Sequence, residues 1–585
     1  MKKIIFLLVI LPALLIGCRN NGKPDSTVAG DEKFLRISEN FIKGYLDWRP
    51  ELSVYLGFHE YDGKTSDLNM KSISDELVRL KSYSQMLKEF DTASLSRKVL
   101  YDLSILQHGI ESEIFYIEDM ASYTMNPITY AYYLDFSTYI KRNFAPLEER
   151  LKDIVAVEKC IPGILTAARA NLADSLPEPY IEIAVQMLKG SISFLQNELV
   201  KGLKEVNNDS LMKEFKKAND IVISEVIAFA GFLEKEKLPK ANNRYELGRE
   251  KYQKMLLAYE GINMTSEEIL EIGLSELRKE QEVFNASAEI ISPGKKPMEV
   301  LQEMQKEHPT AENLIPDIRK NIEAIHQFLI DRKIVTIPSD TRVQVEETPE
   351  YSRSLGFAMM DPPGAFEKIA TEAYYYITPP DPEWSAREKE EWLSTFDYYT
   401  SDLISIHEAY PGHFIQLTYL NKSAATKIEK IFGSYAFIEG WAHYTEKMMI
   451  DEGYGNTGDP VKAAKYRLAQ SGEALVRLCR LCVSIKMHCE GMSIDDATKF
   501  FMDNWYHGEK PSREEARRGT YDPGYLYYTL GKLMVLKLRQ DYQKQEGDNF
   551  NLQKFHDLLL ENGMPQILIL RKEILKDKNI WNEIL

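Results

Sequence analysis

The chain has 585 residues, with 89 acidic and 72 basic side chains, a formal charge of −17 at pH 7 and 44% hydrophobic residues. This length and composition are sufficient for a large soluble protein with a substantial core. The acidic balance argues against a nucleic-acid partner, because phosphate backbones bind to basic surfaces. Five cysteines are too few for a disulfide framework in a chain of this length.

The first residues have the pattern of a bacterial export signal. Met1-Lys2-Lys3 precedes an apolar run, residues 4–16, that is too short to span a bilayer comfortably. Leu15-Ile16-Gly17-Cys18 resembles a lipobox, in which the cysteine is acylated and becomes the mature N-terminus. We expect a signal peptide at 1–17 and a flexible tether at 18–33. The protein would then be lipid-anchored in the cell envelope, at the outer membrane or cell surface rather than the inner membrane. A plain signal peptide with a chance cysteine is the alternative.

Residues 34–334 are a succession of helical patterns, which predict a helical scaffold. Residues 148–172 carry apolar side chains with a period near 3.6, and Pro162-Gly163 within them predicts a kink or a split. A capping box from Thr265 to Glu268 predicts the start of another helix. Residues 335–585 are expected to be the catalytic, metal-binding region, or the two regions form one intertwined domain.

A short β-rich part precedes the strongest chemical motif. Residues 341–347 alternate with period two, and residues 372–377 are rich in tyrosine and end at a pair of prolines. Residues 360–364 between them read as a loop. We expect at least two paired strands here. Their edge is either a place for an extended peptide substrate or part of an ordinary small sheet.

The strongest motif is His407-Glu408-Ala409-Tyr410-Pro411-Gly412-His413. It is similar to the zinc-peptidase pattern H-E-x-x-H, but two extra residues separate the histidines. On a regular helix a six-residue step leaves two side chains ~240° apart. We therefore expect Pro411-Gly412 to form a bulge that returns His413 to a metal bound by His407. A loop with two unrelated histidines is the alternative.

A hydrolytic zinc site needs a third protein ligand. In the helix expected from Ser434 to about Gly453, three ionisable residues fall on the apolar, core-facing side. Because carboxylates rarely point inward unless they are paired or bind a metal, we predict Glu439 as the ligand. His443 and Glu446 would orient the ligands. A buried structural ion pair is the alternative.

Two later stretches supply candidates for substrate and oxyanion binding. The helix expected over 464–490 is apolar almost all round, but Arg480 and His488 lie on one polar stripe. Arg480 could bind a substrate carboxylate and His488 could stabilise an oxyanion, although pairing of the arginine with a structural acid is an equal alternative. Pro523-Gly524 opens another helix, on which Tyr525 and Tyr528 share a face and their phenols suit the same task.

The thiols do not form an evident site. Cys479 and Cys482 have the spacing of a redox or zinc motif, but they stand in an apolar helical run without a second pair. Buried thiols are the preferred interpretation. A disulfide involving Cys479, Cys482 or Cys489 stays open, because an envelope compartment is oxidising.

The segments HEAYPGH, FIEGWAHYTE, RLCVSIKMHCEG and DPGYLYYTLGKL together resemble the bacterial domain-of-unknown-function 885 family. That family is grouped with zincin-like metallopeptidases. The resemblance implies a mostly α, large helical zincin-like peptidase fold with a cleft and a small β-sheet next to the metal motif. It places His407, His413 and Glu439 at the metal positions and Glu408 at the position of the general base.

The resemblance also covers His488 and Tyr528, which match recurrent family positions. The family pattern often has a further histidine directly after the one matching His413, where this chain has Phe414. That departure affects the surroundings of the site and leaves the three expected ligands intact.

We therefore expect a gluzincin-like zinc metallopeptidase with one Zn²⁺ and an oligopeptide substrate. Metal-activated water would attack the peptide with Glu408 as general base, His488 and Tyr528 would assist, and Arg480 and Tyr525 would contact the substrate. One alternative is a lipid-anchored peptide-binding protein with a non-catalytic metal site. Another is a metal-dependent amidase or esterase acting on a non-peptide substrate.

Overall fold

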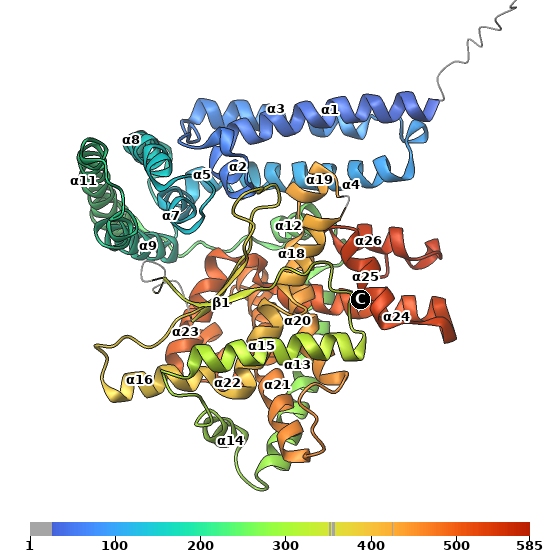
Figure 1. Ribbon diagram of the computed structural model, residues 1–585. Helices are drawn as coiled ribbons and strands as arrows, with labels where there is room; N and C mark the ends of the chain where they lie inside the picture. Colours follow the sequence, from blue (N-terminus) through green and yellow to red (C-terminus); the bar gives the residue numbers. More distant parts are fainter. Residues whose placement is uncertain (1–25, 350–352, 354–356, 424) are drawn as a thin grey trace, which may run out of the picture.

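The computed structural model describes residues 26–349, 353, 357–423 and 425–585, which form a mostly helical molecule with one small sheet (Figure 1). The expected signal peptide, the expected lipidation site Cys18 and residues 18–25 of the expected tether lie outside the described residues. Residues 26–33, also expected to belong to the flexible tether, are instead the start of helix α1 (Ser26–Trp48). Among the residues described, no helix is long and apolar enough to cross a membrane.

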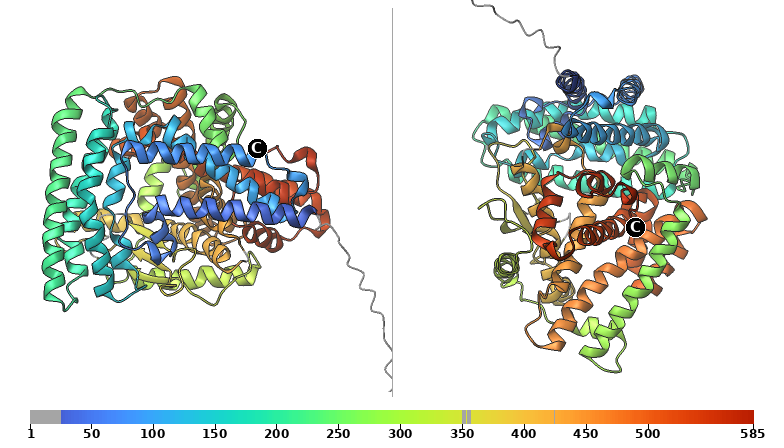
Figure 2. Two further views of the ribbon diagram at one scale, coloured as in Figure 1. Left: turned by 90° about the horizontal axis from the view of Figure 1, so that it is seen from above. Right: turned by 90° about the vertical axis from the view of Figure 1, so that its right-hand side faces the viewer.

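The N-terminal helices form two neighbouring groups. Helices α1, α3 and α4 run along one face, and α8, α9 and α11 stand beside them (Figures 1 and 2). The α-helices of this part are α1 (Ser26–Trp48), α2 (Pro50–Leu56), α3 (Met70–Lys88), α4 (Arg97–Ile114), α5 (Ser122–Met125), α6 (Ile128–Ala131), α7 (Ser137–Lys141), α8 (Leu147–Asn171), α9 (Glu178–Gln196), α10 (Glu198–Gly202) and α11 (Asp209–Phe232).

The later helices build the body that carries the metal motif. They are α12 (Arg249–Glu260), α13 (Ser266–Ile291), α14 (Pro297–Met304), α15 (Leu314–Arg332), α16 (Ala386–Leu393), α17 (Tyr398–Glu408), α18 (His413–Lys422), α19 (Lys427–Ile431), α20 (Tyr435–Asp451), α21 (Pro460–Glu490), α22 (Ile494–Trp505), α23 (Glu509–Tyr521), α24 (Tyr527–Glu546), α25 (Leu552–Glu561) and α26 (Ile567–Ile574). A short 3₁₀ turn, η9 (Pro523–Leu526), precedes α24. The long helices α13 and α21 pack against each other.

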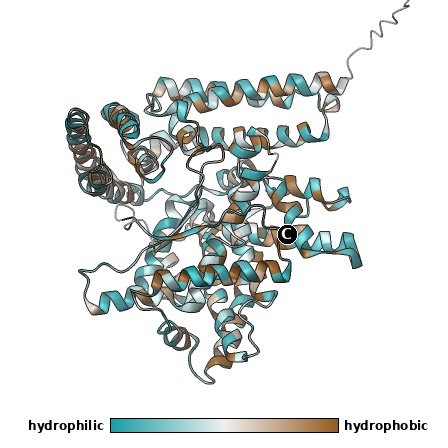
Figure 3. Cartoon of the chain, in the orientation of Figure 1, coloured by the Kyte–Doolittle hydropathy of each residue, from teal (hydrophilic) through white to brown (hydrophobic). Residues whose placement is uncertain are grey.

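Two buried hydrophobic clusters meet within this architecture. One consists mainly of residues between Phe34 and Leu233, and the other of residues from Tyr245 onward. The change therefore lies near residue 240, before the regional boundary that the sequence suggests at 334. The clusters interlock, because Ile428, Phe432 and Ile569 belong to the N-terminal one. Most helices carry both apolar and polar residues, as amphipathic packing requires (Figure 3).

The predicted strands pair in one three-stranded sheet with the order β1-β3-β2. The central strand β3 (Tyr374–Ile377) is parallel to β1 (Gln344–Glu347) and antiparallel to β2 (Ala358–Asp361). The expected loop at 360–364 is therefore wrong for its first two residues, which pair with β3. The Tyr375 hydroxyl lies 3.4 Å from Ser405 Oγ on α17, so the sheet adjoins the helix that carries His407.

Local helix signals are mostly confirmed. The Thr265 capping box is present at the start of α13. Helix α8 nevertheless continues through Pro162 to Asn171, so the expected split does not occur. Its apolar face is buried and packs against α11, and this packing outweighs the lost backbone hydrogen bond.

Candidate metal centre

The two motif histidines lie close together because the chain folds back between α17 and α18. The Gly412 N–H donates to the Ile406 carbonyl at 3.0 Å. A Cβ at Gly412 would overlap the His407 carbonyl oxygen, so this close approach requires glycine. The His407 and His413 rings are 4.9 Å apart between centroids. The bulge predicted at Pro411-Gly412 is confirmed.

Helix α20 is fixed against this turn at its start and its middle. Ser434 Oγ accepts the Phe437 N–H at 3.0 Å and caps the helix, as the sequence predicts. The same hydroxyl donates to buried Glu260 at 2.5 Å. Farther along, Trp441 Nε1 donates to the Pro411 carbonyl at 3.0 Å. These contacts hold α20 beside the histidine motif.

His407, His413 and Glu439 bring their donor atoms together. One ligand atom from each lies within 4.8 Å of the others, and this is the sole such cluster of three or more His, Cys, Asp or Glu residues in the described ranges. Glu439 Oε2 lies 3.5 Å from His407 Nε2 and 3.7 Å from His413 Nε2. This oxygen is buried and has no hydrogen-bond partner. Two imidazoles and one carboxylate are a donor set that suits Zn²⁺.

A second layer of side chains holds the ligands from behind. Glu446 accepts hydrogen bonds from His407 Nδ1 at 2.7 Å and from His443 Nδ1 at 3.1 Å. Arg477 Nη2 lies 3.4 Å from the same carboxylate, and Lys532 Nζ lies 3.4 Å from His443 Nε2. Because His407 donates its Nδ1 proton to Glu446, its Nε2 is directed towards the ligand cluster. The positions of His443 and Glu446 agree with the sequence prediction.

A crossing of two helices brings α24 to this centre. Gly440 on α20 faces Gly531 on α24, and a Cβ at either position would overlap the backbone of the other helix. The absence of both side chains permits the close approach. Lys532 follows directly after Gly531, and Tyr528 lies one turn before it.

Electrostatics favour an ionised carboxylate in this cluster. Burial would raise the pKa of Glu439, but the adjacent His407 and His413 outweigh burial and lower it to about 2. Burial lowers the pKa of His413. Burial would also lower the pKa of His407, but Glu439 and Glu446 beside it raise that pKa to about 10. A negative group next to basic ring nitrogens is the environment in which a cation binds.

Glu408 is well placed to handle a proton. It is the last residue of α17, directly follows His407 and is only partly buried. In the part of the chain that the structure describes, its carboxylate has no hydrogen bond or ion pair. The Glu408 charge acts on both motif histidines, because it helps to raise the pKa of His407 and opposes the lowering of the pKa of His413 by burial.

Aromatic residues and an arginine lie at the edge of the cluster. Tyr435 is one turn before Glu439 on α20, and residues four apart lie on the same helix face. The Tyr528 ring is 5.8 Å from the Tyr435 ring. Arg518 Nη2 donates to the Tyr435 hydroxyl at 3.4 Å. Burial raises the pKa of Tyr528, and Glu439 adds to the rise, so the predicted neighbour Tyr528 is close to the centre.

His488 does not belong to this centre, which corrects the sequence prediction. It is 1% exposed, its Nε2 donates to the Gly519 carbonyl at 2.8 Å, and its ring stacks on Tyr252. Eleven residues, or about 16 Å of helix, separate it from Arg477, which contacts Glu446. His488 lies on the polar stripe of α21 but packs in the protein interior.

Arg480 and Tyr525 also differ from the prediction. Arg480 donates to both carboxylate oxygens of Glu515 at 2.7 Å, so the alternative of an ion pair with a structural acid holds. Tyr525 is fully buried and its hydroxyl packs at Gly519, so it has no exposed surface with which to contact a substrate. Cys479 and Cys482 are buried free thiols, and the described cysteines form no disulfide.

Three residues near the centre escaped the sequence analysis. Arg518 lies five residues before Pro523-Gly524, and its charge was the available signal. Tyr435 lies four residues before Glu439, and this spacing on one helix face could have marked it. Glu260 is distant in sequence from everything it contacts, and nothing in its surroundings gives a signal.

Comparison with known proteins agrees with this architecture. The structure of a putative lipoprotein of unknown function from Shewanella oneidensis is similar with a TM-score of 0.78 and 25% identity, covering 93% of this chain and 100% of that one. The putative lipoprotein from Colwellia psychrerythraea has a TM-score of 0.73 and 18% identity, over 96% of this chain and 99% of that one. None of the curated proteins compared matches the chain.

A family profile described as a bacterial protein of unknown function (DUF885) matches residues 50–574. The match includes the histidine motif, α20, α21 and the start of α24, which together supply the ligands, Glu446, Arg477 and Tyr528. The chain therefore belongs to the DUF885 family of bacterial proteins.

Proposed function

We propose that this protein is a metal-dependent hydrolase with a zincin-like site, and most specifically a zinc metallopeptidase that cleaves oligopeptides. The observation that carries the proposal is the cluster of His407, His413 and Glu439, whose donor atoms converge while Glu439 Oε2 has no hydrogen-bond partner. That oxygen lies 3.5 and 3.7 Å from the two ring nitrogens, so a cation between them would contact all three donor atoms. The donor set fits Zn²⁺.

The side chains have distinct tasks in this proposal. A divalent cation held by the three ligands supplies Lewis-acid catalysis when bound. Glu408 accepts a proton from the attacking water and passes it to the leaving amine. Glu446 keeps His407 in the orientation that points Nε2 at the cluster. Tyr528, whose phenol stays protonated at neutral pH, donates a hydrogen bond to the developing oxyanion.

The location follows from the N-terminal sequence. The lipobox-like segment ending at Cys18 and the two similar lipoproteins support a lipid-anchored protein of the bacterial envelope, at the outer membrane or cell surface. A peptide in that compartment is the substrate class that we propose. The sheet β1-β3-β2 beside α17 offers outer strands along which an extended chain can pair.

The test combines metal analysis with a peptide library. Bound metal is measured in the purified protein, which is then incubated with mixed peptides and analysed by mass spectrometry. We expect about one Zn²⁺ per chain, cleavage by the wild type, and none by metal-loaded Glu408→Gln. Glu391→Gln, an exposed carboxylate on α16, is the matched control and should cleave normally.

The remaining outcomes separate the alternatives. Equal cleavage by wild type and Glu408→Gln would overturn the role of Glu408. A metal-loaded wild type that binds peptides but leaves them intact would instead identify a peptide-binding protein. Hydrolysis of esters or non-peptide amides alone would change the substrate class, and absence of any metal binding would remove the proposed centre.

A further inference from the structure

Arg518 is linked to the metal ligands through two phenols. Tyr435 lies one helical turn before Glu439, and its hydroxyl accepts a hydrogen bond from Arg518 Nη2 at 3.4 Å. The Arg518 guanidinium carbon is also 5.8 Å from the centre of the Tyr528 ring. A positive group therefore stands at the edge of the centre, about one tyrosine side chain away from a ligand.

Three arginines surround Tyr528, but only one of them is open to a ligand. Arg477 is paired with Glu473 and Glu446, and Arg480 is held by both oxygens of Glu515. The side chains of Arg477 and Arg480 are 12% and 13% exposed, whereas that of Arg518 is 29% exposed. The sequence predicts Arg480 as the residue that binds a substrate carboxylate. Arg518 is the better candidate, because its side chain is more exposed.

The pairing of Arg518 leaves donors for a second anion. Its Nε and Nη2 both donate to a single oxygen of Asp522, at 3.0 and 2.9 Å. This fixes the plane of the guanidinium, and Nη1 has no carboxylate partner among the residues described. Arginine binds carboxylates strongly because its planar group presents several donors in a fixed geometry.

The two phenols can add further donors. Burial raises the pKa of Tyr435 and of Tyr528, so both hydroxyls keep their protons at neutral pH. Glu439 and Glu408 are the carboxylates of the centre, whereas Arg518, the most exposed of the three arginines, lies at the Tyr528 ring. A ligand with a carboxylate on that side and a neutral amide at the metal cluster matches this distribution.

We propose that Arg518, with the hydroxyls of Tyr435 and Tyr528, binds the free α-carboxylate of a peptide whose scissile bond lies at the His407–His413–Glu439 cluster. The proposal rests on the proposed peptidase function and makes it specific: the protein acts near the C-terminal end of peptides with a free carboxylate. Asp522 is the positioning residue that orients the guanidinium.

Matched peptides test this on the wild-type protein alone. Each peptide is prepared as the free acid and as the C-terminal amide, and kcat/KM is measured for both. We expect the free acid to be cleaved at least about tenfold more efficiently, since one charge-assisted interaction is lost with the amide. Equal values for the two forms would overturn the proposal.

Variants assign the preference to Arg518. Arg518→Met should lose the discrimination, and Arg518→Lys should restore part of it. The neighbouring Arg517 is paired with Glu182 and is 28% exposed, so Arg517→Met is the matched control and should keep the full preference. Loss of the preference in Arg517→Met as well would contradict the assignment.

Binding separates this proposal from the peptidase function itself. Dissociation constants of the free-acid and amide peptides are measured calorimetrically on metal-loaded Glu408→Gln, where no cleavage is expected. Tighter binding of the free acid, by about tenfold, supports the carboxylate site even if the wild type cleaves neither peptide, which would contradict only the peptidase function. Equal binding would overturn the carboxylate site.

Discussion

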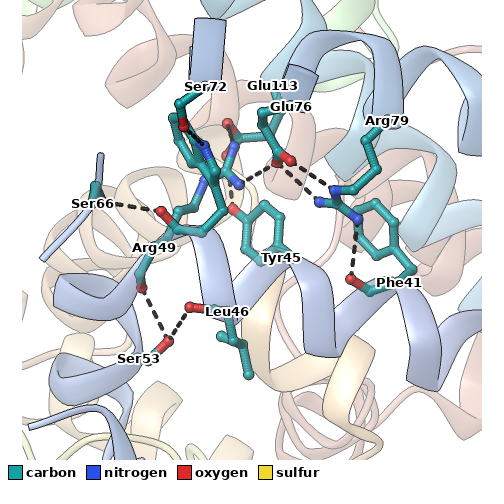
Figure 4. A network of polar contacts seen from close by, with 11 residues as sticks. Phe41, Tyr45, Leu46, Arg49, Ser53, Ser66, Ser72, Glu76, Arg79 and Glu113 are labelled. Atoms are coloured by element: carbon teal, nitrogen blue, oxygen red, sulfur yellow. Dashed lines mark hydrogen bonds and ion pairs between the residues drawn. The ribbon is translucent and has the colours of Figure 1, made fainter. Parts of the chain in front are cut away.

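Two buried charged clusters in this molecule have opposite characters. In the N-terminal part, Arg49 pairs with Glu76 at 2.7 Å and with Glu113 at 2.6 Å (Figure 4). Arg79 donates twice to Glu76, and the Tyr45 hydroxyl donates to Glu113. Each charged group in this cluster is satisfied by another side chain. The cluster is closed, and we interpret it as structural.

In the cluster around His407, one carboxylate has a full set of partners and the other does not. Glu446 is paired with His407, His443 and Arg477, much as Glu76 is paired in the N-terminal part. Glu439, in contrast, keeps an oxygen without a hydrogen bond, next to two ring nitrogens. Burial of charge alone therefore does not distinguish a binding site from a structural network. The feature that separates the His407 cluster from the Arg49 network is the convergence of one donor atom each from His407, His413 and Glu439.

The largest effect is expected in the closed N-terminal cluster around Arg49. Arg49→Met should reduce the free energy of unfolding by about 3 kcal/mol, because it leaves buried Glu76 and half-buried Glu113 with fewer partners. The value is at the lower end of the usual range since Arg79 still holds Glu76. Urea unfolding measures the loss. The exposed Lys43→Met serves as control, and reduced metal affinity in Arg49→Met would contradict a purely structural role.

The second-largest effect is expected in the cluster around His407. Glu439→Gln should weaken Zn²⁺ binding by more than about 100-fold, because a charged ligand is replaced by a weak neutral one. Competition with a chromogenic chelator measures the affinity. The free energy of unfolding measured without metal should change less than in Arg49→Met. Wild-type affinity in this variant would remove Glu439 from the ligand set.

A smaller effect is expected behind the ligands. Glu446→Gln keeps the side-chain shape but cannot accept from both His407 and His443 as a carboxylate does. We expect Zn²⁺ affinity to fall by about 10- to 100-fold. Glu473→Gln, which removes another partner of Arg477, is the control and should retain wild-type affinity. A similar loss in both variants would indicate a general electrostatic effect of the arginine.

Glu158 is a buried carboxyl group that belongs to neither of the two clusters. It is buried on α8 with both oxygens unpaired, and no potential ligand cluster in the described ranges includes it. Burial raises its pKa to about 9, so the folded state retains a proton that the unfolded state loses above about pH 4.5. Stability contributed by this residue is therefore present at low pH and is lost as the pH rises towards 9.

Removal of this carboxyl group should stabilise the protein. Glu158→Met should increase the free energy of unfolding by about 1–2 kcal/mol at pH 8 and much less at pH 5. At pH 8 the wild-type carboxyl group ionises when the protein unfolds, which favours the unfolded state, and the variant lacks this group. Urea unfolding at both pH values measures the difference. A pH-independent effect would mean that the carboxyl group does not hold its proton in the folded state.

The fold class and much of the centre could be predicted from sequence. Helical periodicity and caps located α13 and α20, alternation located β1, and a tyrosine-rich run that ends at two prolines located β3. The inward position of Glu439 and Glu446 on α20 followed from the spacing of apolar residues around them. These features depend on local geometry, in which the period of a helix or strand relates sequence to one face.

Tertiary structure decided which polar residues meet. His488 and Arg480 share a stripe on α21, but a helix face spans many ångströms along its axis and different elements cover its two ends. His488 is buried against Tyr252, and Arg480 forms an ion pair with Glu515 from α23. Arg518 on α23 meets Tyr435 on α20 and Tyr528 on α24 only through the packing of helices that are distant in sequence. The sequence by itself determined the candidate ligands and the helix faces on which they lie. Long-range packing decided their partners, because periodicity carries no information about which helix packs opposite.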